Sequence, residues 1–197
     1  MTETNNKTTE IINEDSDSDD REIGGHCWFG SHVSKKMVDF VAPYCCNCSA
    51  NKELTILDIG TGNGDLLFRL AKKLRNSSDQ SSNPTNARFI GMDYCQDAIQ
   101  LAKSLAHSRL EQEVKVEWVV DDALHVRNLT NSSIDIILDK GTFDAIASNG
   151  CSQMVKQYVK SLTELGKNGT LLCITSANFI VEELNNVMDY TKFPHNK

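Results

Sequence analysis

Five aspartates at the ends of short apolar runs are the residues best suited to bind a ligand. They are Asp58, Asp93, Asp121, Asp122 and Asp139, and they follow four separate runs. A carboxylate beside a buried strand loses hydration unless a partner replaces the water. In an open parallel sheet, ligands bind beyond the carboxyl ends of the strands. We therefore expect these acids to face a ligand that carries hydroxyl groups and a cationic centre.

The turn after the first of these runs is rich in glycine. Residues 58–65 read D-I-G-T-G-N-G-D, an acid followed by glycines at alternate positions. Glycine lets the backbone turn sharply and approach a ligand closely, with the N-terminus of the next helix behind it. A dinucleotide-binding fingerprint needs its third glycine where Asp65 stands. Asp58 and Asp65 would also repel a pyrophosphate, so the turn favours a cofactor without phosphates.

The elements that must position these residues alternate along the chain. Apolar runs rich in β-branched residues predict strands over 54–58, 88–93, 116–121, 134–139 and 170–175. Helical spacing of apolar residues predicts helices over 66–74, 98–105 and 155–165, and another over 31–41 that ends before Pro43. This alternation is typical of an α/β fold with a mostly parallel sheet covered on both faces.

The glycine turn and the strand-end acids resemble the seven-strand S-adenosylmethionine-dependent methyltransferases, which have a Rossmann-like fold. The first motif of that family is acid-x-G-x-G-x-G. Its members place an acid that binds the ribose hydroxyls at the position of Asp93, and an acid and a backbone N–H that read adenine at Asp122 and Ala123. The resemblance implies S-adenosyl-L-methionine as the cofactor, bound by Asp58, Gly60, Gly62, Gly64, Asp93, Tyr94, Asp122, Ala123 and Asp139.

A longer set of motifs resembles a narrower family. Residues 139–145 read D-K-G-T-F-D-A, residues 28–30 read W-F-G, and residues 174–179 read I-T-S-A-N-F. Together they are similar to the elongation factor 1-alpha lysine methyltransferases of the Efm4/See1 type, over residues 24 to 185. This resemblance implies a protein-lysine N-methyltransferase whose protein substrate is elongation factor 1-alpha.

For such an enzyme, the expected catalytic residues are Asp139, Phe143 and Trp28. Transfer to a lysine needs a neutral amine, and an apolar, aromatic channel disfavours the ammonium form. Trp28 and Phe143, with Phe29 and Tyr94, are the candidate walls, although Phe29 is equally suited to the core. Asp139 could accept a hydrogen bond from the amine or orient the turn after it. Lys140 is interpreted as a structural or substrate-facing residue.

The end of the sequence departs from this family, which closes its sheet with a C-terminal hairpin. Phe193 and Pro194 stand where that hairpin would begin, and the sequence given ends at Lys197. The hairpin is therefore expected to be missing. Two alternatives stay open: methyl transfer to another protein or a small molecule, and a shortened isoform that is not catalytic.

Composition sets the remaining expectations. Residues 1–22 hold eight acidic and two basic residues, which predicts a disordered acidic tail ahead of a methyltransferase domain over 23–197. The domain is nearly neutral, with 19 acidic and 18 basic residues and no basic stripe, so no nucleic acid is expected. No apolar run spans a membrane and no signal peptide is evident. We expect a monomer in the cytoplasm or also the nucleus, with its seven cysteines reduced and no bound metal.

Overall fold

The computed structural model describes residues 29–46, 53–76, 87–110 and 114–189. They form one five-stranded sheet in the order β3-β2-β1-β4-β5, in which every neighbouring pair is parallel. Helices connect β1 to β2, β2 to β3 and β4 to β5, whereas residues 121–133 connect β3 to β4 without a helix. The elements are α1 (Gly30–Cys46), β1 (Leu54–Ile59), α2 (Asp65–Asn76), β2 (Ala87–Asp93), α3 (Gln96–Arg109), β3 (Val116–Val120), β4 (Ile134–Lys140), α4 (Thr142–Ala147), α5 (Ser152–Leu165), β5 (Gly166–Thr175) and α6 (Val181–Asp189).

The five predicted strands are confirmed, and the burial of β1 explains its sequence. All six residues of β1 are buried, because β2 and β4 pair with its two edges and helices cover both faces. A strand in that position needs a continuous apolar run. β5 begins earlier than predicted, at Gly166, and its pairing with β4 is irregular between Ile134 and Ile136.

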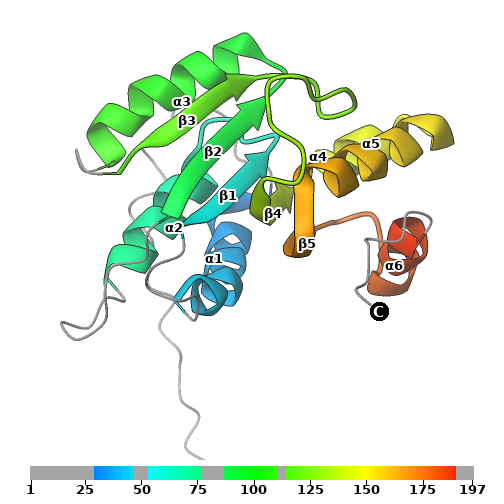
Figure 1. Cartoon of the computed structure of the whole chain (residues 1–197), viewed down its shortest axis with the longest axis horizontal. Helices are drawn as coiled ribbons and strands as arrows, with labels where there is room; N and C mark the ends of the chain where they lie inside the picture. The colour runs from blue at the N-terminus through cyan, green and yellow to red at the C-terminus, as the bar shows by residue number, and fades with distance from the viewer. Residues whose placement is uncertain (1–28, 47–52, 77–86, 111–113, 190–197) are drawn as a thin grey trace, which may run out of the picture.

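Two apolar cores lie on opposite faces of the sheet. Successive side chains of β1 point to opposite faces of the sheet. Ile56 belongs to the core under α1 and α2, whereas Leu57 belongs to the core under α4, α5 and α6. Figure 1 shows these two groups of helices on either side of the strands, with α3 beside β2 and β3. Because every neighbouring pair of strands is parallel, the carboxyl ends of all five strands lie at the same edge of the sheet.

The first helix is longer than predicted. It runs from Gly30 to Cys46 and contains Pro43. A proline inside a helix removes one backbone hydrogen bond. Here the helix continues because Ala42 and Cys45, on either side of Pro43, are buried in the core against α2.

Some expectations concern residues outside the described ranges. The acidic tail over 1–22, Trp28, two of the seven cysteines (Cys27 and Cys48), and Phe193 and Pro194, where the hairpin would begin, all lie there. Within the described ranges, no helix is long and apolar enough to cross a membrane. The same part of the chain contains no group of three or more His, Cys, Asp or Glu side chains that could hold a metal ion.

Candidate functional site

A cleft of about 550 Å³ opens at the carboxyl ends of the strands. Its volume lies in the range of small-molecule sites. The lining comes from the glycine turn, the ends of β2 and β4, the loop after β3, and the first turns of α4 and α5. The lining residues include Gly60, Gly62, Met92, Asp93, Tyr94, Asp121, Asp122, Ala123, Leu124, Lys140, Gly141, Thr142, Ile146, Asn149 and Met154.

Asp58 shapes the glycine turn from behind and does not line the cleft. Its side chain is 2% exposed and accepts a 2.7 Å hydrogen bond from the Thr61 hydroxyl. The backbone N–H groups of Gly60 and Thr61 donate to the Met92 carbonyl at 2.8 and 2.9 Å, which fixes the turn against β2. Burial raises the pKa of Asp58 to about 6, although the Thr61 hydrogen bond opposes that shift.

The three glycines of the turn have different surroundings, although all have positive φ. A Cβ on Gly60 would lie 1.9 Å from the Thr142 hydroxyl oxygen, and one on Gly64 would lie 2.6 Å from the Trp118 ring. A Cβ on Gly62 would meet no atom within 4 Å. Gly60 and Gly62 line the cleft, whereas Gly64 does not and packs against the rings of Trp118 and Phe68.

Asp93 lies on the cleft wall and holds two loops together. One carboxylate oxygen accepts a 2.9 Å hydrogen bond from the Gly62 N–H, and the other accepts one of 2.9 Å from the Cys95 N–H. Its side chain is 9% exposed. Each carboxylate oxygen has a further lone pair, so Asp93 can also accept hydrogen bonds from a ligand in the cleft.

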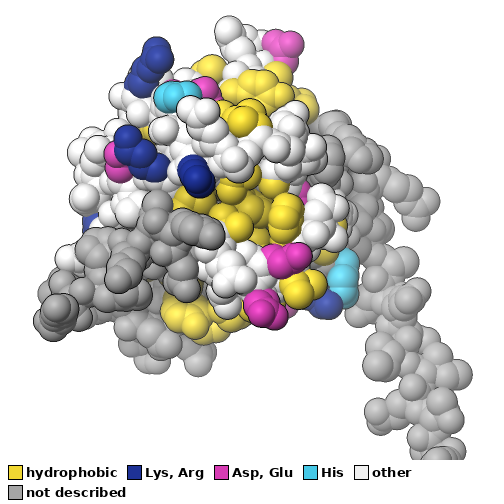
Figure 2. Space-filling model, turned by 90° about the vertical axis from the view of Figure 1, so that its right-hand side faces the viewer, with side chains coloured by type: hydrophobic (Ala, Val, Ile, Leu, Met, Phe, Trp, Pro, Cys, Tyr) yellow, Lys and Arg dark blue, Asp and Glu magenta, His cyan; other side chains and the backbone are white. Residues whose placement is uncertain are grey.

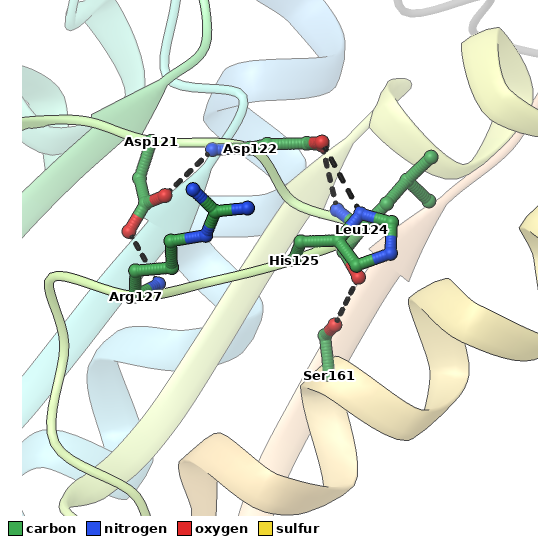
Figure 3. Close-up of polar contacts among 6 residues, drawn as sticks. All are labelled: Asp121, Asp122, Leu124, His125, Arg127 and Ser161. Carbon is green, nitrogen blue, oxygen red and sulfur yellow. Dashed lines mark hydrogen bonds and ion pairs between the residues drawn. The ribbon is translucent and has the colours of Figure 1, made fainter.

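The loop after β3 presents two acids with different partners (Figure 3). Asp121 accepts hydrogen bonds from the backbone N–H groups of Asp122, Arg127 and Asn128 at 2.7–2.9 Å. Asp122 accepts a 2.9 Å hydrogen bond from the Leu124 N–H and pairs with the His125 ring at 3.5 Å. Asp121 therefore folds the loop, while Asp122 is about half exposed at the cleft.

The Leu124 carbonyl joins this loop to α5. It accepts a 3.1 Å hydrogen bond from the Ser161 hydroxyl, which rises from the helix toward the loop in Figure 3. Leu124 and Ala123 line the cleft beside Asp122. The α5 helix thus helps to fix the part of the wall that the sequence assigned to adenine.

Asp139 lies behind the cleft, and the structure favours its predicted role in orienting the turn. Its side chain is fully buried. It accepts hydrogen bonds from the backbone N–H groups of Thr142 and Phe143 at 2.8–3.2 Å and from the Tyr158 hydroxyl at 2.7 Å. Burial raises its pKa to about 7, although these hydrogen bonds favour the ionised form. Asp139 is not among the residues that line the cleft.

Phe143 also differs from its expected place. The ring is fully buried against Tyr158 and Phe179, with ring centroids 6.3 and 5.1 Å apart, and it does not line the cleft. Tyr94 does line the cleft, and its side chain is 82% exposed. Phe29 packs against the turn after β4: a Cβ added to Gly141 would lie only 2.6 Å from the Phe29 ring.

Several cleft residues on the α4–α5 side are not predicted from the sequence. Ile146, Asn149 and Met154 line the cleft, as does Thr142, whose hydroxyl donates a 2.7 Å hydrogen bond to the Ile59 carbonyl. They come from the six-residue helix α4, the connection after it and the start of α5. The spacing of apolar residues in so short a helix does not indicate which side faces a ligand. Lys140 lines the cleft as well.

The donors and acceptors of the cleft fit S-adenosylmethionine. Three acids, Asp93, Asp121 and Asp122, line it together with one cation, Lys140, which suits hydroxyl groups and a positive centre better than phosphate. Apolar side chains give a surface on which a flat ring can pack. The open space above Gly62 permits close approach to the backbone.

The chain matches known methyltransferases along most of its length. Residues 50–195 match a methyltransferase domain family. The chain is 33% identical over 172 residues to the protein-lysine N-methyltransferase efm4 of Schizosaccharomyces pombe, covering 81% of this chain and 68% of that protein. It is 36% identical over 170 residues to EEF1A lysine methyltransferase 2 of Homo sapiens, covering 84% of this chain and 64% of that protein.

A solved structure agrees in fold. The TehB-like SAM-dependent methyltransferase from Corynebacterium glutamicum superposes with a TM-score of 0.54 at 16% identity, over 85% of this chain and 73% of that one. This likeness concerns the α/β fold and its parallel sheet. From the domain match and the relatives, the chain belongs to the methyltransferase domain family, in the group that contains the Efm4-type protein-lysine N-methyltransferases.

Proposed function

We propose that this chain is an S-adenosylmethionine-dependent protein-lysine N-methyltransferase whose substrate is elongation factor 1-alpha. The observation that carries the proposal is Asp93, which joins the glycine turn to the end of β2 and faces the cleft. The names of the S. pombe and human relatives support the choice of a lysine and of this substrate. The chain spans 64–68% of the length of these relatives, so the activity of the whole protein is part of the proposal.

The cofactor would be held by residues at or just after the carboxyl ends of three strands, β1, β2 and β3. Asp93 would accept hydrogen bonds from the ribose hydroxyls, and Asp122 with the Ala123 N–H would contact the adenine edge. Gly60 and Gly62 would leave room for the ligand against the backbone. When bound, S-adenosylmethionine supplies a methyl group activated by its sulfonium sulfur.

The chain's own contribution to transfer is to orient the amine and to favour its neutral form. A lysine in water has a pKa of ~10.4, so its ammonium must lose a proton before it can act as a nucleophile. Ile146 and Met154 border the cleft and Tyr94 lies exposed at it, and apolar side chains around an amine would disfavour its charged form, while Asp93 and Asp122 would be engaged by the cofactor. Alignment of the amine then contributes much of the remaining acceleration.

We further propose that the five described strands belong to a seven-strand methyltransferase sheet. The order β3-β2-β1-β4-β5 leaves β5 at one edge, where further strands could pair. The domain boundary near residue 23, a monomeric state, the lack of a nucleic-acid partner and a cytoplasmic location stay predictions from the sequence.

Methyl transfer to purified elongation factor 1-alpha tests the function. The full chain is incubated with the factor and methyl-labelled S-adenosylmethionine, and the modified residue is located by mass spectrometry. We expect label on a lysine of the factor. A parallel incubation uses a cell lysate in place of the purified factor. Label in other proteins of the lysate, with none on the factor in either incubation, would contradict the proposed substrate and favour a different acceptor.

A further inference from the structure

A second cavity, of about 660 Å³, lies between α4, α5 and α6. Phe143 forms its floor, and Val155, Val159, Phe179 and Val187 form much of its sides. Figure 2 looks at this side of the molecule and shows hydrophobic side chains gathered in its centre. Cavities lined mainly by apolar and aromatic side chains are typical of binding sites. We call this cavity the α5–α6 groove.

The charged residues of the groove are cationic. Lys156 and Lys160 on α5 line it, and no acidic residue is among its lining. Lys160 lies 3.7 Å from Glu164, whereas Lys156 has no ion-pair partner among the described residues. In Figure 2, Lys or Arg side chains lie above and to the left of the hydrophobic centre, with some acidic side chains among them, and further acidic side chains lie below it. The α5 border therefore complements a segment that is both apolar and acidic.

The groove and the cofactor cleft share one wall. Phe143, Ala147 and Cys151 line the groove, while Ile146 and Asn149 from the same stretch line the cleft. Helix α4 and the residues after it thus separate two cavities that open side by side. A protein segment in the groove would lie close to an amine that enters the cleft.

We propose that the α5–α6 groove docks an acidic, apolar segment of the protein substrate. This inference rests on the proposed function. The apolar side chains of the segment fill the groove, and its carboxylates pair with Lys156 and Lys160. Docking beside the cleft would let the enzyme select a protein rather than a free amine. Contacts remote from the reacting lysine contribute binding energy that orients its amine at the reacting centre.

Three exposed cysteines allow each region to be monitored in the same molecule. Cys151 lines the groove, Cys95 lines the cleft, and Cys46 lies at the end of α1 away from both. The rate at which iodoacetamide alkylates each thiol can be followed by mass spectrometry of the full chain. S-adenosylhomocysteine should slow the reaction of Cys95 alone.

Two probes test docking. The first is a synthetic peptide of alternating Glu and Leu or Phe, compared with the same peptide carrying Lys in place of Glu. The second is purified elongation factor 1-alpha. We expect the Glu peptide and the factor to slow alkylation of Cys151 by about fivefold at saturation, with Cys46 unchanged, and the Lys peptide to have no effect.

A charge reversal on the groove gives the matched control. Lys156→Glu should raise the probe concentration that half-protects Cys151 by about three- to tenfold. The control Lys103→Glu, which changes an exposed lysine on α3, should leave that concentration unchanged. Both lysines are exposed helix residues, so neither change should disturb folding.

Each outcome has a distinct meaning. Protection of Cys151 without methyl transfer would keep the docking site and contradict the proposed function. Methyl transfer with Cys151 unprotected by either probe would overturn the docking site alone. Equal protection by the Glu and Lys peptides would overturn the acidic preference. If Cys151 in the isolated chain already reacts far more slowly than Cys46, a segment of the chain itself occupies the groove and the proposal is wrong.

Discussion

The hydroxyl of Tyr158 donates a 2.7 Å hydrogen bond to Oδ2 of Asp139, and both side chains are fully buried. Tyr158 belongs to α5 and Asp139 to β4. Asp139 also accepts hydrogen bonds from the backbone N–H groups of Thr142 and Phe143. The pair therefore ties α5 to the turn that lines both cavities, and its loss should affect stability and the cleft together.

Replacing Tyr158 by phenylalanine should lower the free energy of unfolding by about 1–3 kcal/mol. The change leaves one oxygen of a buried carboxyl without its hydroxyl donor. Urea denaturation of Tyr158→Phe measures the effect. Ser161→Ala is the matched control, because it removes another hydroxyl of α5 whose partner is the Leu124 carbonyl. Equal pH dependence of unfolding in the two variants would contradict a specific role for Tyr158 at Asp139.

The pH dependence of stability should carry the signature of the two buried acids. Burial raises the pKa of Asp58 to about 6 and that of Asp139 to about 7, both from 3.8. Between pH 3.8 and these raised pKa values, the folded state binds more protons than the unfolded state. The free energy of unfolding therefore falls as the pH rises from about 4 through about 7.

The variant Asp139→Asn isolates one of these contributions. Between about pH 5 and about pH 8, the wild-type free energy of unfolding should fall by on the order of 2 kcal/mol more than that of the variant. Urea denaturation at several pH values measures both. A variant with the same pH profile as the wild type would show that Asp139 is ionised throughout.

Two glycines of the turn should respond differently to alanine. Gly64→Ala places a Cβ 2.6 Å from the Trp118 ring at a φ of +82°, so it should lower stability by about 2–4 kcal/mol. Gly62→Ala meets no atom at a φ of +55° and should cost only about 1–2 kcal/mol. Its main effect should be weaker binding of S-adenosylhomocysteine. Thermal unfolding and calorimetry separate the two effects, and a more stable Gly64→Ala would refute the packing role of Gly64.

The strands and part of the cleft could be predicted because their signals are local. Each buried parallel strand is a continuous apolar run, and the end of such a run marks the ligand edge of the sheet. That rule placed Asp93 and Asp122 correctly on the cleft. It failed for Asp58 and Asp139, because a strand-end acid can equally turn back and accept hydrogen bonds from its own turn.

The remaining differences depend on contacts between distant parts of the chain. Gly64 must be glycine because Trp118 of β3 packs on it. Phe143 faces the second cavity because Asp139 fixes the start of α4 and Phe179, far along the chain, covers the ring. No spacing within residues 139–145 carries that information. Pro43 lies inside α1 because core packing on both sides outweighs one missing hydrogen bond.

The affinity for S-adenosylhomocysteine, compared between the wild type and Asp93→Ala, tests the central claim most directly. Asp93→Ala removes charged hydrogen bonds worth ~1.5–3 kcal/mol, so calorimetry should show binding weakened by about 10- to 150-fold. Glu117→Ala, which removes an exposed acid of β3 paired with Arg88, should bind as the wild type does. Equal affinity in the wild type and Asp93→Ala would contradict the assignment of the cleft as the cofactor site.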